Sequence, residues 1–95
     1  MAHGVTRSEI RKVKSIVSLI GKQNLSTLVN TDYQYIRGRH VYVTKTDDNE
    51  LALSIWDEPK DEKTSHCLFA DRISIAALMA AVDYWRLRYP ATTQY

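Results

Sequence analysis

The clearest pattern in the chain is an alternation of apolar and polar side chains over residues 33–56. The aliphatic positions of this stretch are Val41, Val43, Leu51, Leu53 and Ile55. The positions between them carry His40, Tyr42, Thr44, Ala52, Ser54 and Trp56. Because successive side chains of a strand point to opposite faces of a sheet, this period predicts two strands with an aliphatic face and a ring-bearing face.

Turn signals bound these strands. The polar run 46–49 has the composition of a hairpin turn, and Gly38 predicts a bulge, bend or turn between Arg37 and Arg39. Residues 66–70 form a further short strand in this interpretation, whereas residues 24–30 fit either a short strand or a helical turn. We therefore expect a curved, antiparallel four-stranded sheet over residues 25–70.

Helical spacing of apolar residues appears on both sides of this sheet. Residues 7–20 follow a capping-box pattern formed by Thr6 and Glu9, and Gly21 stands at the expected helix end. A second helix, residues 74–88, begins at Ser74 as the N-cap. Its apolar stripe, flanked by alanines that allow close approach of another backbone, predicts a homodimer interface made of Ile75, Leu78, Met79, Val82 and Trp85.

The composition adds limits to this α+β prediction. A chain of 95 residues with one cysteine forms a single domain, residues 1–95, without an internal disulfide. We expect an intracellular protein of the cytoplasm or nucleoid, or of the nucleus in a eukaryote, because no signal-peptide core or membrane-length apolar run is visible. Residues 1–46 hold eight basic and two acidic side chains, an imbalance that favours a polyanionic partner or reflects a solvated surface.

Motifs for catalysis or cofactor binding are missing from the sequence. His3, His40, His66 and Cys67 lack the spacing of zinc ligands, and no nucleophile elbow or glycine-rich phosphate loop is present. The adjacent acidic pairs fall in turns and charged segments, where they are solvated. We therefore expect no enzyme activity, no metal and no cofactor.

Rings and cations interleave along the predicted strands, as in surfaces that bind unpaired bases. Rings stack on bases and cations contact phosphates, whereas duplex DNA hides the faces of its bases. The alternative is that individual rings belong to a core or to a dimer contact. The candidate nucleic-acid-binding residues are Tyr35, Arg37, Arg39, His40, Tyr42, Lys45 and Trp56.

The order of these segments resembles the transcriptional coactivator family called Positive Cofactor Four. The matching pieces are residues 39–43, residues 51–58 and residues 72–75, which read RHVYV, LALSIWDE and RISI. The likeness covers roughly residues 35–85. Trp56 stands where the family usually has arginine, and by position the family's DNA contacts fall on Arg39, Tyr42 and Trp56.

This resemblance implies a homodimer whose C-terminal helices pack together and whose concave sheets bind single-stranded or melted DNA with little sequence preference. Members act in transcription, replication, recombination or repair in eukaryotes, bacteria and bacteriophages, so replication or transcription proteins are further partners. We expect a non-catalytic, dimeric accessory factor of this kind, without membrane association. The alternative is a small protein-interaction module, an inhibitor or adaptor of a host enzyme, that uses the acidic residues 57–62 or the alanine-rich helix.

Overall fold

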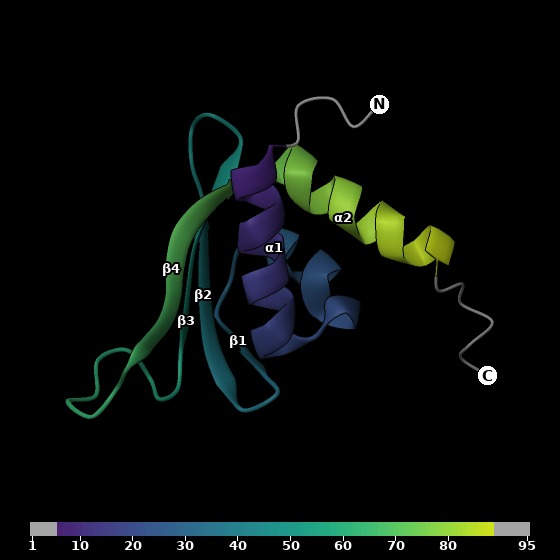
Figure 1. Ribbon diagram of the computed structural model, residues 1–95. Coiled ribbons are helices and arrows are strands. Elements are labelled where there is room, and N and C mark those ends of the chain that lie inside the picture. Colours follow the sequence, from purple (N-terminus) through teal and green to yellow (C-terminus); the bar gives the residue numbers. More distant parts are fainter. Residues whose placement is uncertain (1–5, 89–95) are drawn as a thin grey trace.

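The structure, a computed structural model, describes residues 6–88, with side chains up to residue 84 in the last helix. Its elements in chain order are α1 (Arg7–Ile20), the 3-10 helix η1 (Lys22–Asn30), β1 (Gln34–Ile36), β2 (Arg39–Lys45), β3 (Glu50–Trp56), β4 (Cys67–Ser74) and α2 (Ile75–Arg88). Figure 1 shows all three helices on the same side of the sheet. The chain is therefore an α+β fold with one helix-covered face and one open face.

The sheet is antiparallel throughout and its strands lie in sequence order, β1-β2-β3-β4. The β1–β2 connection is a two-residue turn in which both Arg37 and Gly38 have positive φ, 52° and 77°. Such turns match the natural twist of a hairpin, and they favour glycine at the second position. The predicted interruption at Gly38 is thus a tight turn between two strands.

Helix α1 begins and ends where the sequence pattern predicts. The Thr6 hydroxyl accepts a hydrogen bond from the Glu9 N–H at 3.2 Å, and the Glu9 carboxylate accepts one from the Thr6 N–H at 3.4 Å. Gly21 ends the helix with φ of 88°. This positive φ favours glycine, and a Cβ at Gly21 would lie 2.6 Å from Nη1 of Arg37, so a larger residue would also displace that side chain.

The sheet is shorter at its start and longer at its end than predicted, spanning residues 34–74 rather than 25–70. Residues 24–30 are helical because Leu25 and Leu28, one 3-10 turn apart, are both fully buried. Side-chain bonds from Asn24 to the Ile20 carbonyl (2.8 Å) and from Thr27 to the Asn24 carbonyl (2.7 Å) support these turns.

At its far end, β4 continues through Ser74, four residues beyond the predicted strand end at Ala70, because Glu50 of β3 still pairs with Ser74. Helix α2 then starts directly at Ile75. The Ser74 hydroxyl accepts a hydrogen bond from the Ala77 N–H at 3.0 Å, which confirms its predicted role as the N-cap.

The apolar stripe of α2, predicted as a dimer interface, packs largely against the chain's own core. Leu78 and Val82 are 0 % and 7 % exposed and belong to the chain's own core, so these two side chains are not accessible to a second copy, and the dimer itself stays a prediction. Ile75 and Met79 are half-buried, and the side chain of Trp85 lies outside the described residues. An amphipathic stripe shows that a helix face is buried, and α1 and η1 provide the surface that buries it.

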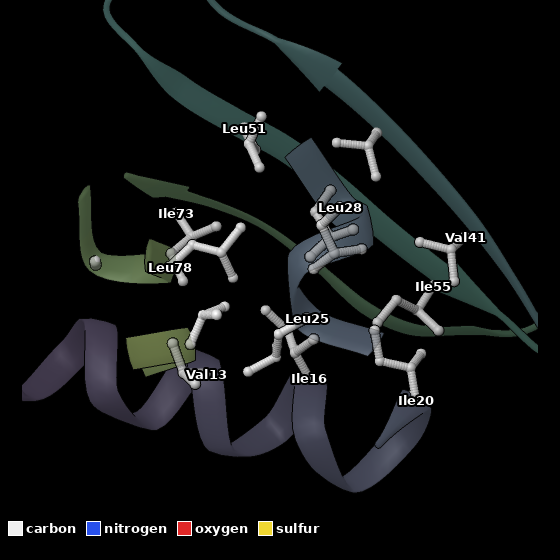
Figure 2. Packing of buried hydrophobic residues seen from close by; sticks show 14 residues of the cluster. Val13, Ile16, Ile20, Leu25, Leu28, Val41, Leu51, Ile55, Ile73 and Leu78 are labelled. Carbon is white, nitrogen blue, oxygen red and sulfur yellow. The ribbon is translucent and has the colours of Figure 1, made fainter. Parts of the chain in front are cut away.

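The core lies between the helices and the aliphatic face of the sheet. Figure 2 shows Val41, Leu51 and Ile55 of the strands directed towards side chains of the helices, with Leu25 and Leu28 of η1 among them. These strand residues are all fully buried. No helix among residues 6–88 is long and apolar enough to cross a membrane.

Candidate functional site

The open face of the sheet carries the ring side chains that the alternation predicts. Strand pairing aligns Tyr35 of β1, His40 of β2 and Trp56 of β3 in one row, and Cys67 of β4 pairs with Trp56 across a register shift in the β3–β4 ladder. Because Val41 and Ile55 beside this row are buried under the helices, the row itself points away from them. Tyr42 lies on the same face, two residues further along β2.

These rings contact one another. The centroids of Tyr35 and His40 are 4.9 Å apart, and those of Tyr33 and Tyr42 are 5.1 Å apart. Tyr33, which precedes β1, also stacks on His40 with its centroid at 5.9 Å. We call this group of Tyr33, Tyr35, His40, Tyr42 and Trp56 the aromatic platform. Tyr33 and Tyr35 are 48 % and 65 % exposed, so the platform presents ring surface to solvent.

A hydrogen bond fixes the arrangement of two platform rings. The Tyr33 hydroxyl lies 2.7 Å from Nδ1 of His40. Loss of hydration, followed by the neighbouring hydroxyls of Tyr42 and Tyr35, raises the pKa of Tyr33, so its phenol stays protonated and is able to donate this bond.

Lys60 brings a positive charge to the platform, and the sequence analysis did not select it. Its Nζ lies 4.7 Å from the centroid of the Tyr42 ring, and its backbone N–H donates to the Tyr42 hydroxyl at 3.2 Å. The loop that carries it is closed at its base, where Asp57 accepts bonds from the His66 N–H (2.7 Å) and contacts its Nδ1 (3.1 Å). The hydrogen bond from the His66 N–H is the main cause that lowers the pKa of Asp57.

The cations expected beside the rings lie elsewhere. Arg39 and Lys45 lie four and two positions from the buried Val43, so their side chains point to the helix side of the sheet. Arg39 is half-buried, and Lys45 is exposed at the end of the strand. Arg37, in the turn, places its guanidinium against Gly21 at the end of α1. The structure therefore does not bring these three predicted site residues to the rings, because the two-residue turn at Gly38 preserves the alternation of β2.

Arg37 instead has a structural position. The last turn of α1 contains no basic residue, and the Arg37 side chain reaches this end of the helix from the β1–β2 turn. Cations near a helix C-terminus are stabilising because the last carbonyl groups carry partial negative charge. The Arg37 guanidinium therefore lies at the C-terminal end of α1 and not on the open face.

The open face is only weakly basic. Besides Lys60, its cation on the strands is Arg72, which lies in the same row as Thr44 and Ala52. Its Nη1 is 3.9 Å from a carboxylate oxygen of Glu50. Acidic side chains of residues 57–62 flank Lys60. Rings rather than cations dominate this surface.

Trp56 is held more firmly than the two exposed tyrosines. Its side chain is half-buried, and its Nε1 is buried without a hydrogen-bond partner in the described part of the chain. It pairs with His40 on one side and Cys67 on the other. Packing between neighbouring strands therefore positions this ring.

The neighbouring Cys67 and His66 side chains contact different partners. The Cys67 thiol is directed towards the Phe69 carbonyl at 3.4 Å, and the His66 imidazole towards Asp57, so these two neighbours do not form a thiol–imidazole pair. Among residues 6–88, no three His, Cys, Asp or Glu side chains are placed to hold a metal ion. His3 lies outside the described residues.

The chain matches no protein-family profile, and the comparisons with curated proteins and with solved structures also give no match. The geometry of the open face is therefore what indicates a function for this chain.

Proposed function

We propose that the open face of the sheet binds single-stranded nucleic acid without sequence preference, with bases stacked on the aromatic platform. One observation carries this proposal: contacting rings from β1, β2 and the segment before β1 gather on the helix-free face, with Tyr33 and Tyr35 about half or more exposed. Rings that keep part of their surface exposed to solvent are suited to stacking on a flat ligand.

The chemistry of the platform favours unpaired bases. Stacking of a base on an aromatic side chain contributes about 1–3 kcal/mol and tolerates any sequence, because every base has a ring face. Paired bases in a duplex do not offer these faces. Lys60 beside Tyr42 and Arg72 on β4 are placed to meet phosphates on either side of the rings. A role as an accessory factor in transcription, replication or recombination, without catalysis, fits such binding.

A titration with a fluorescent readout tests the proposal. The chain has two tryptophans, so a Trp85→Phe background leaves Trp56 as the sole reporter. Adding oligo-dT is expected to quench Trp56 emission, and the matching duplex is expected to bind more weakly. Unchanged emission with micromolar oligonucleotide at low salt would argue strongly against the proposal.

Cys67 offers an independent check because it is the only cysteine, is exposed and pairs with Trp56. Bound oligo-dT is expected to slow alkylation of its thiol by a maleimide. An equal concentration of polyphosphate, which has charge but no bases, serves as the control and is expected to protect less. Equal protection by both would mean that charge rather than stacking drives binding.

A second candidate function is supported by the same exposed tyrosines. Tyr and Trp are enriched at protein–protein interfaces, and the acidic residues 57–62 beside the platform suit a basic protein partner. This alternative is favoured if the pure chain binds no oligonucleotide while a pull-down retains one protein after nuclease treatment.

A further inference from the structure

Strand β4 forms one edge of the sheet and, with eight residues, is its longest strand. An edge strand presents unpaired N–H and C=O groups, to which a strand from another chain is able to add. Edges of this length therefore need protection in a protein that stays soluble.

The pairing with β3 identifies the outward groups. The Ile75 N–H donates to the Asn49 carbonyl at 3.1 Å, one residue beyond the Glu50–Ser74 pair. In an antiparallel ladder this places Ser74, and every second residue before it, at positions that do not bond to β3. The backbone groups of Ala70, Arg72 and Ser74 therefore point away from the sheet.

Side chains occupy both outward groups of Arg72. Nζ of Lys12, on α1, donates to the Arg72 carbonyl at 2.7 Å and lies 3.5 Å from a carboxylate oxygen of Asp71. That Asp71 oxygen accepts a hydrogen bond from the Arg72 N–H at 2.8 Å. Figure 1 shows the first turns of α1 beside this end of β4.

Ser74 is engaged from the same helix. Burial acts to raise the pKa of Glu9, but hydrogen bonds from the Ser74 hydroxyl, the Thr6 N–H and the Ser74 backbone lower it overall. Glu9 and Lys12 are three residues apart and so lie on one face of α1. Their side chains together meet the groups that a fifth strand would bond.

We infer that Glu9 and Lys12 of α1 close the β4 edge and prevent a second copy of this chain from adding to it. A second copy is the partner that this contact excludes, because β4 is able to pair antiparallel with its own copy about a two-fold axis. Ala70, exposed and outward-facing, remains the open centre of such a pairing. This inference does not depend on the proposed function.

The test replaces Lys12 with a residue that keeps the aliphatic stem but loses the charged donor. Lys12→Met is expected to strengthen self-association at least about tenfold over wild type in sedimentation velocity, because one charge-assisted bond on the edge is lost. Lys14→Met, at an exposed position of the same helix, is the matched control and is expected to behave as wild type.

A proline at Ala70 locates the association. Because the Ala70 N–H points outwards, Ala70→Pro removes an edge donor without breaking a bond to β3. Adding Ala70→Pro to Lys12→Met is expected to return self-association to the wild-type level. The inference is overturned if Lys12→Met associates no more than wild type, or if the double variant still associates.

Hydrogen exchange in the wild-type protein gives a measurement that needs no variant. The outward amides of Arg72 and Ser74 are expected to exchange more slowly than the outward amide of Ala70. Equal exchange of all three amides would show that Glu9 and the Lys12–Asp71 pair do not protect this edge and would overturn the inference.

Discussion

The two faces of the sheet are built from the same strands but serve different purposes. On the helix side, Val41, Leu51 and Ile55 are fully buried, and their packing holds the fold together. On the open side, Tyr35 is mostly exposed and contacts the ring of His40. Since neighbouring residues of one strand serve opposite faces, substitutions one position apart should separate stability from binding.

The largest effect is expected on the helix side. Ile55→Ala should reduce the free energy of unfolding by about 2–5 kcal/mol, because it leaves a cavity in a closely packed core. Urea denaturation followed by circular dichroism measures this loss. Ser54→Ala, one residue away on the open face, is the control and should cost less than about 1 kcal/mol. A similar loss for both variants would mean that the two faces are not energetically distinct.

On the open side, the expected effect is on binding. Tyr35→Ala should weaken oligo-dT binding by about 1–3 kcal/mol through loss of one stacking surface, with the urea midpoint almost unchanged. Fluorescence titration measures the affinity. Tyr35→Phe keeps the ring and should retain the wild-type affinity. If Tyr35→Ala binds as tightly as wild type, the platform does not contact bases at β1.

Two lysines distinguish the faces by salt dependence. Lys60 lies over the ring of Tyr42 on the open face, whereas the side chain of Lys45 points to the helix side of β2. Each phosphate contact to a single strand contributes about −0.7 to the slope of log K against log salt concentration. Lys60→Ala should make this slope shallower by about that amount, and Lys45→Ala should leave it unchanged. The reverse result would place the nucleic acid on the other face.

A smaller effect is expected in acid. The pKa of Glu9 in the folded chain is below its ordinary value of 4.5, so the unfolded state binds more protons as the pH falls through that range. The stabilisation is complete above pH 4.5 and is lost below it. Urea midpoints at pH 7, 5, 4 and 3 should show this loss, and Glu9→Gln should show less of it.

Local sequence patterns predict much of this fold. The capping box at Thr6, the N-cap at Ser74 and the alternation of β2 and β3 each depend on residues close together in the chain, and each is present. The separation of the sheet into an aliphatic face and a ring face follows from that alternation alone. This is why the rings of the candidate site were predictable.

The errors concern contacts between distant segments. Whether Leu78 packs on its own chain or on a second copy depends on where α1 and η1 lie. The spacing of the apolar residues along α2 does not contain that information. Lys60 reaches Tyr42 only because the loop folds back through Asp57 and His66. Arg37 was predicted to lie beside the rings because it is close to them in the sequence. Its guanidinium lies instead at Gly21, at the end of α1.

The turn between β2 and β3 also limits how this chain tolerates insertions. Its four residues, 46–49, are fixed by bonds from the Thr46 N–H to the Glu50 carbonyl (2.8 Å) and from the Glu50 N–H to the Thr46 hydroxyl (3.1 Å). Sliding β3 by one residue would exchange its two sets of side chains, placing Trp56 under the helices and Ile55 in water. Length variation should therefore be acceptable between residues 58 and 65 but not in this turn.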